Sequence, residues 1–343
     1  RSIGETSDIV TKEMYTFNDK NDDVVCMTPE GTASCMRLAF ENNLVYDRGV
    51  KKNRLYYYSP MFRHERPQKG RYRQFTQFGV EFMGNGSTDD DIDLLQLSSI
   101  FFREIDLKDI SLHINSLGST DERAKYSTKL KDYFNKYSNS FNNQQINTIN
   151  RNPLRLLDNK DSKLEDVINN SPVISDYLGK SSLSRFEDIT NSLSILGIDF
   201  TLDTRLVRGL DYYNDLVFEW KTDKLGTQDA ICAGGRYDSL SKSISDIEIP
   251  AVGFAMGVDR IVELININNI EHVIGLSVIT DNKADLHKVS SQLRQTNTKF
   301  RLVQMDIDKS LSKQIKSAVK HNCDILIIVG SDEISNNMLT VKY

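Results

Sequence analysis

A short basic stretch between two strand-like segments constrains the fold of this chain more than any other feature. Residues Leu55–Phe62 and Gln74–Met83 both have the aromatic and apolar content of strands. Between them, five basic residues fall within the eleven positions 63–73, beside a proline and a glycine that indicate a loop. Two strands joined by such a loop would direct several guanidinium groups toward one point, and the arginine fork suits phosphate oxygens. The stretch favours a polyphosphate site, with a solvated hairpin tip as the alternative.

The second strand of this unit carries polar residues on one face. With a period of two, Phe75, Gln77, Gly79 and Glu81 point the same way. A glutamine, a glycine and a glutamate make poor core material, so we interpret this face as a pocket floor. Gly79 would leave room for a ligand, and its two polar neighbours would contact it. The alternative is a strand face that meets water.

Three later segments add residues that suit ligand binding, although each is a weak signal alone. In LVRGLDYY (206–213), Arg208 stands between apolar residues and a glycine, which suggests an arginine held by the backbone. A purely structural pair with Asp211 is the alternative there. In AGGRYD (233–238), two glycines allow a ligand to approach the backbone closely. In GFAMGVDR (253–260), glycines precede an arginine near a helix start.

The pattern of elements divides the chain into blocks. Strands and helices mix up to about residue 117, and helical patterns dominate from 119 to 196. Within the helical block, the polar SNSFNNQQINTINRN is expected to be an exposed connection. Strand patterns return at 200–206, 215–221 and 228–233, and AVGFAMGVDRIVELI reads as a strand that enters a helix. From 273 onward strand and helix alternate, which predicts a small α/β domain after a boundary near 266–271.

Composition excludes several classes of protein. The four cysteines are far apart and form no CxxC pair, so we expect neither a structural metal nor a disulfide framework. No apolar run approaches the roughly 20 residues that span a bilayer, so we expect no membrane association and a cytoplasmic location. The net charge of −5 does not indicate a nucleic-acid binder, but a locally basic surface would suffice for one.

Together these segments resemble the class II aminoacyl-tRNA synthetases, and among them the histidyl-tRNA synthetase family. FRHERPQKGRYRQF resembles the second motif of that class and AVGFAMGVDR its third. RGLDYY and AGGRYD resemble two histidine-specific segments, TPEGT (28–32) resembles an amino-acid-binding loop, and NPLRLLD (152–158) resembles part of the insertion domain. The segments follow the family's order and cover essentially the whole chain.

The resemblance implies an α+β fold. An antiparallel class II sheet with helices would occupy residues 1–117 and 201–268, and a helical insertion domain would occupy 118–200. A C-terminal α/β domain at 272–343 would bind the anticodon. The family's first motif, a main part of its dimer interface, would precede Arg1, and the C-terminal domain would stop before its last helix. A homodimer is expected.

The resemblance also implies a histidine–tRNA ligase. Such an enzyme uses ATP, accompanied by Mg²⁺, to form histidyl-adenylate and pyrophosphate from L-histidine, and then loads tRNA(His). Arg63 would grip the α-phosphate, and Arg208 would contact both this phosphate and the histidine carboxylate. The remaining expected contacts are Glu30, Thr32 and Gln77 to the α-amino group, Glu81 and Tyr213 to the imidazole, Glu65 near the adenine, and Arg71 and Arg260 to the outer phosphates.

Two alternatives and one departure accompany this interpretation. Asp259 stands before Arg260 where the family usually has glutamate. A non-catalytic relative that binds histidine, such as the regulatory subunit of ATP phosphoribosyltransferase, is the main alternative. Such relatives tend to lose the arginines that grip ATP, which this chain keeps. A generic nucleotide-binding protein would account for the basic loop but leave the other segments unexplained.

Overall fold

A computed structural model of the chain describes residues 9–45, 53–84, 86–159, 161–208, 210, 212–226, 229–265, 272–279, 283–295 and 300–342. The chain divides into two compact units, Arg1–Ile265 and Asn266–Tyr343, each described here by itself. Every helix in these described ranges is too short or too polar to cross a bilayer.

A seven-stranded sheet forms the centre of the N-terminal unit. Its neighbouring strands are antiparallel except for one parallel pair, the last two. In spatial order they are β3 (Asn53–Phe62), β4 (Gln74–Met83), β9 (Ala251–Gly257), β8 (Ala230–Arg236), β7 (Asn214–Lys221), β5 (Ser111–Ser116) and β6 (Phe200–Leu202). Strands β3 and β4 pair along their whole length, so the predicted strand–loop–strand unit is confirmed.

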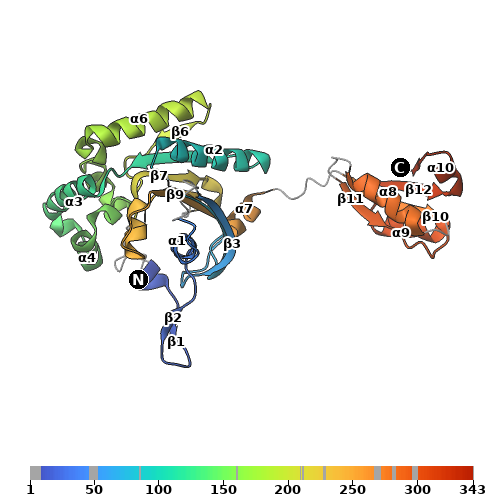
Figure 1. Cartoon of the computed structure of the whole chain (residues 1–343), viewed down its shortest axis with the longest axis horizontal. Coiled ribbons are helices and arrows are strands. Elements are labelled where there is room, and N and C mark those ends of the chain that lie inside the picture. The colour runs from blue at the N-terminus through green and yellow to red at the C-terminus, as the bar shows by residue number, and fades with distance from the viewer. Residues whose placement is uncertain are drawn as a thin grey trace. The chain divides into compact units, whose positions relative to one another are not determined.

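Helices cover both faces of this sheet because its central strands are apolar on both sides. On one face, α2 (Thr88–Glu104) and α6 (Lys180–Ile195) enclose a core that includes Phe218. On the other face, α1 (Thr32–Glu41) packs into a second core that includes Val217, the preceding residue of the same strand. Figure 1 shows the two longer helices above the sheet and α1 below it. α7 (Val258–Leu264) continues directly from β9.

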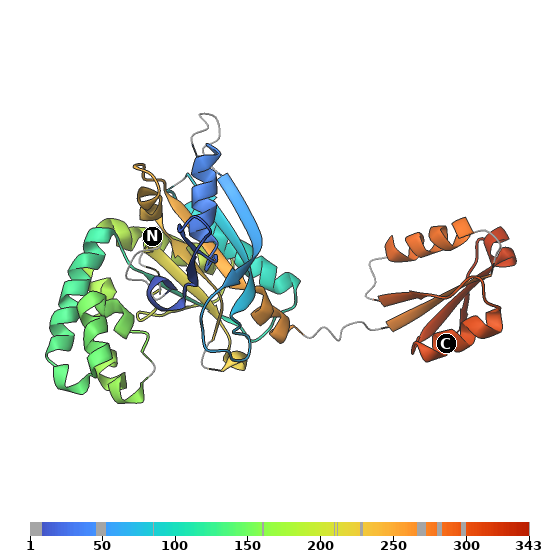
Figure 2. The same cartoon turned by 90° about the horizontal axis from the view of Figure 1, so that it is seen from below.

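A group of helices lies beside the sheet, as Figure 2 shows in green. It contains α3 (Thr120–Asn135), α4 (Asn143–Arg151) and α5 (Glu165–Asn169). The exposed connection expected here is wrong for its second half, which is α4. Asn142 and Gln145 form a reciprocal capping box at its start, and Ile149 is buried, so a polar segment still forms a helix. α6 lies within the predicted helical block 118–200, yet it packs against α2 of the sheet domain.

Shorter elements complete the N-terminal unit. A two-stranded hairpin, β1 (Thr16–Asn18) and β2 (Val24–Cys26), projects from the body in Figure 1. It follows the π-helical turn η1 (Ile9–Glu13). The 3₁₀ turns are η2 (Ser138–Ser140), η3 (Pro153–Leu156), η4 (Ser162–Leu164), η5 (Ile174–Tyr177), η6 (Asp223–Leu225) and η7 (Asp238–Ser243).

The C-terminal unit is a small α/β domain, as its alternating pattern predicted. Its sheet has the order β11 (Phe300–Gln304), β10 (His272–Ile279), β12 (Ile325–Gly330) and β13 (Thr340–Lys342), with only β13 antiparallel to its neighbour. Alternate residues of β12 enter separate cores, Ile327 with α8 (Lys283–Gln295) and Leu326 with α9 (Leu311–Lys320). The two helices therefore cover opposite faces. α10 (Ser331–Ser335) follows β12.

Candidate active site

A polar cavity of about 300 Å³ opens over the sheet, where the loop 63–73 meets β4, β8 and the segment before β7. Nine of the ten residues predicted to contact substrates line it, although they come from five separate parts of the chain. They are Glu30, Thr32, Arg63, Glu65, Arg71, Gln77, Arg208, Tyr213 and Arg260. The tenth, Glu81, lies fully buried behind Thr32.

Three arginines gather at one end of the cavity. Arg63 donates from Nε to the carbonyl of Pro29 at 2.7 Å, and its guanidinium carbon lies 5.1 Å from the centre of the Phe75 ring. Arg260 donates from Nε to the carbonyl of Gly70 at 2.9 Å. Burial and the positive charges of Arg71 and Arg63 hold the pKa of Arg260 below its usual value. Like charges held this close favour an anionic ligand that would neutralise them.

One carboxylate stands among these arginines. Glu65 forms an ion pair with Arg71. Burial raises the pKa of Glu65, but the hydrogen bond and charge of Arg71, with Arg63 and Arg260 nearby, lower it below its usual value overall. The carboxylate is therefore ionised, and it neutralises part of the cluster without filling the cavity.

A second group of side chains in the site is acidic, and it adjoins Arg63 through Pro29. Glu30 accepts hydrogen bonds from the backbone N–H groups of Thr32 at 2.9 Å and Ala33 at 3.0 Å, at the start of α1. Burial raises the pKa of Glu30. Behind it, Glu81 accepts from the Thr32 hydroxyl at 2.7 Å and from the Tyr237 hydroxyl. Burial raises the pKa of Glu81 to about 8, although both hydrogen bonds lower it.

The space beside Gly79 is occupied by protein, which corrects the expectation that it would admit a ligand. A Cβ at Gly79 would lie 2.1 Å from the ring of Tyr57, and one at Gly31 would lie 2.2 Å from the same ring. The two glycines make room for this tyrosine, whose hydroxyl donates to Gln77 at 3.3 Å. The amide oxygen of Gln77 also accepts from the Gly31 N–H at 3.1 Å. Gly79 on β4 therefore makes room for the ring of Tyr57, which lies next to the site.

Arg208 also lines the cavity. It forms an ion pair with Glu219 on β7, and its guanidinium carbon lies 5.8 Å from the centre of the Tyr213 ring. Burial lowers the pKa of Arg208, but the negative charge of Glu219 raises it overall, so the guanidinium is charged. Asp211, the partner considered from the sequence, lies outside the described residues.

Asp259, which stands where the family usually has glutamate, is hydrogen-bonded to the sheet. Asp259 accepts a hydrogen bond from the backbone N–H of Thr76 at 2.7 Å. This contact joins the start of α7 to β4 beside the basic loop. The shorter side chain therefore still makes a definite contact at this position.

Sequence reasoning missed three residues of the site: Tyr57, Glu219 and Tyr237. The first stands in a strand noted for its aromatic content, and the third stands in AGGRYD, where the glycines drew attention instead. Glu219 lies within β7 and gave no signal, because an acid on a strand usually faces water. Only the cross-strand arrangement shows that it lines the cavity.

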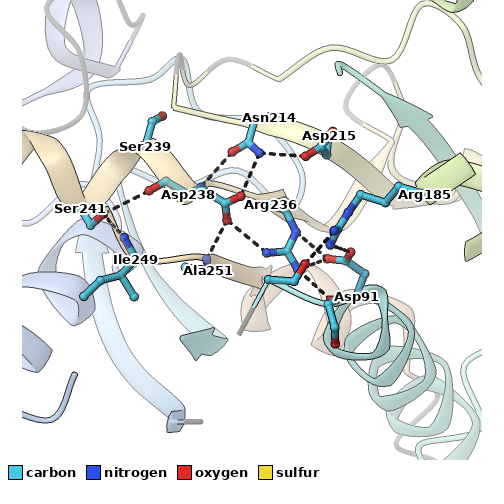
Figure 3. A network of polar contacts seen from close by, with 12 residues as sticks. Asp91, Arg185, Asn214, Asp215, Arg236, Asp238, Ser239, Ser241, Ile249 and Ala251 are labelled. Carbon is cyan, nitrogen blue, oxygen red and sulfur yellow. Dashed lines mark hydrogen bonds and ion pairs between the residues drawn. The ribbon is translucent and has the colours of Figure 1, made fainter. Parts of the chain in front are cut away.

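A buried ionic network supports the segment that carries Tyr237, as Figure 3 shows. Arg236 donates to Asp91 from Nε at 3.0 Å and Nη2 at 2.7 Å, and to Asp238 from Nη1 at 3.1 Å. Arg185 of α6 pairs with the other oxygen of Asp91. Asp238 in turn accepts from the Ala251 N–H at 2.8 Å. The network joins α2, α6, β8 and β9, so it holds Tyr237 in place beside Glu81.

The described residues offer no metal centre. No three histidine, cysteine, aspartate or glutamate side chains among them are placed to hold an ion together. The four cysteines are free thiols.

Comparisons with known proteins agree on one family. A family model described as histidyl-tRNA synthetase matches residues 1–261. The apo histidyl-tRNA synthetase of S. aureus is 29% identical, with 96% of this chain and 81% of that chain covered and a TM-score of 0.66.

Two more distant structures show the fold alone. The histidyl-tRNA synthetase of Nostoc sp. PCC 7120 is 18% identical, with 96% and 81% coverage and a TM-score of 0.62. A Bacillus halodurans C protein described as an ATP phosphoribosyltransferase regulatory subunit/histidyl-tRNA synthetase is 22% identical, with 96% and 86% coverage and a TM-score of 0.59. The family match over most of the chain, with this fold, shows that the protein belongs to the histidyl-tRNA synthetase family.

Proposed function

We propose that this chain is a histidine–tRNA ligase, which activates L-histidine with ATP and transfers it to the 3′ end of tRNA(His). The observation that carries the proposal is an acidic group and a cluster of arginines in one cavity. Glu30 lines the cavity beside Thr32, and Arg63, Arg71 and Arg260 line it around Glu65. Arg63 donates to the carbonyl of Pro29, next to Glu30, so the acidic and basic groups adjoin. An amino acid with its ammonium on Glu30 would present its carboxylate to ATP phosphates held by the arginines.

Activation in this arrangement is mainly alignment and charge compensation. A carboxylate oxygen of histidine attacks the α-phosphorus, and pyrophosphate leaves as the bond to the β-phosphate oxygen breaks. The attacking group is already ionised, so no general base is needed. Arg63 and Arg208 compensate the charge that develops at the α-phosphate, while Arg71 and Arg260 hold the outer phosphates. Mg²⁺ enters as part of the MgATP substrate.

Histidine is selected in this proposal by two directional partners of its ring. Tyr213 and Glu81 bind opposite sides of the imidazole, while Glu30, Thr32 and Gln77 receive the α-amino group. An analogue without ring nitrogens would lose both directional contacts, and Glu81 would keep only the hydroxyls of Thr32 and Tyr237. Rejection by a factor of about 10⁴ is reasonable for such a site.

The second half-reaction requires tRNA to reach the same cavity. The 3′ hydroxyl attacks the carbonyl carbon of histidyl-adenylate, and AMP leaves. A second cavity, lined by Arg123, Arg151 and Arg208, shares Arg208 with the first. Basic side chains of this kind suit the phosphates of an acceptor end. In the proposal, the C-terminal unit binds the anticodon and two copies of the chain form a dimer.

Exchange of labelled pyrophosphate into ATP tests the proposal, using the full-length protein and each of the twenty amino acids in turn. Exchange that depends on histidine alone supports histidine activation. Charging of tRNA(His) by the same preparation then tests the transfer step.

A regulatory, non-catalytic role is the second candidate, favoured by the description of the Bacillus halodurans relative. Retention of Arg63, Arg71, Arg208 and Arg260 around one cavity weighs against it. Binding of histidine without exchange for any amino acid would support the regulatory role and contradict the ligase.

A further inference from the structure

Arg208, one of the arginines that line the cavity, lies in a segment without regular secondary structure. This segment runs between β6 and β7, and the residues on either side of Arg208 in the described chain form no helix or strand. A catalytic group carried on such a segment needs an anchor, because a displacement of about 1 Å can cost a factor of 10² in rate.

Glu219 has the rigid surroundings that Arg208 lacks. It lies within β7, in register with His113 of β5 on one side and Ala233 of β8 on the other. Its Oε1 atom pairs with Nη1 of Arg208, and its Oε2 atom lies 3.5 Å from Nζ of Lys221. That ammonium group lies 3.2 Å from Asp203. The carboxylate is therefore held on both sides and cannot turn away without breaking a second ion pair.

The contact with Glu219 engages one edge of the guanidinium group. The Nε atom of Arg208 is buried and has no hydrogen-bond partner among the described residues. An unsatisfied buried donor is costly, and an anion entering the cavity would relieve that cost. Glu219 also lines the cavity, so the ion pair sits at the site itself.

We propose that Glu219 is a positioning residue for histidine activation: it anchors the Nη1 edge of Arg208 and thereby orients the guanidinium toward the substrate anions. This inference rests on the proposed function, since it concerns the reaction in which Arg208 compensates charge. The anchor depends on the length of the glutamate side chain and on a hydrogen-bond acceptor at its end. It depends less on the negative charge, because Lys221 already neutralises part of that charge.

Three substitutions separate anchoring from charge. Glu219→Gln keeps the length and an acceptor oxygen but removes the charge. Glu219→Asp keeps the charge but withdraws it by one methylene, and Glu219→Ala removes the anchor. Asp109→Asn, which breaks an exposed ion pair with Lys224, serves as the control for loss of a surface carboxylate. The assay is histidine-dependent pyrophosphate exchange, with kcat and the KM for histidine measured for each full-length protein and thermal melting recorded alongside.

We expect kcat to fall by about 10- to 100-fold in the alanine and aspartate variants, and by less than about fivefold in the glutamine variant. The KM for histidine should change less than kcat, and the control should stay within about twofold of the wild type. If the alanine variant fails to fold, the glutamine and aspartate variants still decide the matter.

Two results would overturn the anchoring role while leaving the ligase intact. One is an exchange rate in all three variants that stays within twofold of the wild-type rate. The other is an aspartate variant as active as the wild type beside an inactive glutamine variant, which would show that charge alone matters. Absence of exchange in the wild-type protein would instead overturn both the ligase and the role of Glu219.

Discussion

Replacing Glu81 by glutamine is expected to stabilise the N-terminal unit at pH 8 while weakening histidine binding. Glu81 is fully buried, and burial raises the pKa of its carboxyl group from 4.5 to about 8. The unfolded chain loses this proton near pH 4.5, whereas the folded chain keeps it until about pH 8. Between these values the unfolded state binds fewer protons, so the stability that depends on this group is complete below pH 4.5 and is lost as the pH rises toward 8.

The size of the effect follows from the width of this interval. Each pKa unit corresponds to about 1.4 kcal/mol, so the shift sets an upper bound of about 4–5 kcal/mol at pH 8. Relaxation of the protein around the charge lowers this figure, and we expect a gain of about 2–4 kcal/mol for Glu81→Gln at pH 8. The gain should nearly vanish at pH 5, where the glutamate is neutral in the folded state. Glu30 also has a raised pKa, and its charge repels that of Glu81, so part of the gain in the variant comes from the loss of this repulsion.

Urea unfolding followed by tryptophan fluorescence provides the measurement. Trp220 is the only tryptophan of the chain, and its buried indole donates to Ser98 at 2.9 Å, so its emission reports on the N-terminal unit alone. Unfolding free energies are compared at pH 5, 6, 7 and 8 for the wild type, Glu81→Gln and the exposed Glu41→Gln control. A difference between wild type and Glu81→Gln that stays constant with pH would refute the argument from burial. Under the proposed function, the variant also binds histidine at least tenfold more weakly in a calorimetric titration.

Three further outcomes follow from the contacts around the site. Tyr237→Phe removes a hydrogen bond that lowers the pKa of Glu81, so the KM for histidine in pyrophosphate exchange should rise about tenfold while the KM for ATP stays constant. Asp91→Ala leaves the buried Arg236 and the partly buried Arg185 without their shared partner and should cost about 3–5 kcal/mol in urea unfolding; a loss below 1 kcal/mol would contradict the importance of the network. Glu122, whose pKa is lowered to about 2 although burial opposes this, accepts from Ser182 and two backbone N–H groups. The contribution of this carboxylate to the free energy of unfolding is present above pH 4.5 and is lost as the pH falls toward 2. In the same unfolding assay, Glu122→Ala should therefore destabilise the protein by about 1 kcal/mol at pH 7 and by nothing at pH 2.

Local patterns in the sequence predicted the parts of the site that depend on local structure. The hairpin of β3 and β4 was predictable because strand periodicity and a Pro/Gly loop act over a few residues, and the arginines of that loop came with it. Contacts between residues far apart in the sequence were not predictable in the same way. Tyr237 and Glu81 are 156 positions apart, and their hydroxyl–carboxylate contact exists only because β9 lies between β4 and β8.

Gly79 illustrates a second limit. A glycine on a pocket-facing strand predicts free space correctly, but the pattern does not say which group fills it. Here the ring of Tyr57, from the neighbouring strand, takes the volume that a ligand was expected to use. The error has a general cause: packing closes any void that a neighbouring side chain can reach, and only the three-dimensional arrangement identifies that neighbour.

The hydrogen-bond partners of Arg236 differ in kind from those of Arg260 and Arg63. Arg236 and Arg260 look alike in the sequence, since each follows glycines near the end of a strand. In the structure, Arg236 donates to two carboxylates, so its charge is neutralised within the protein. Arg260 donates to the carbonyls of Gly70 and Ala230, and Arg63 donates to that of Pro29. A carbonyl fixes the direction of a guanidinium group without cancelling its charge, so these arginines are oriented while Glu65 offsets only part of their combined charge. That combination is what a polyphosphate site requires, because the ligand itself must supply the negative charge.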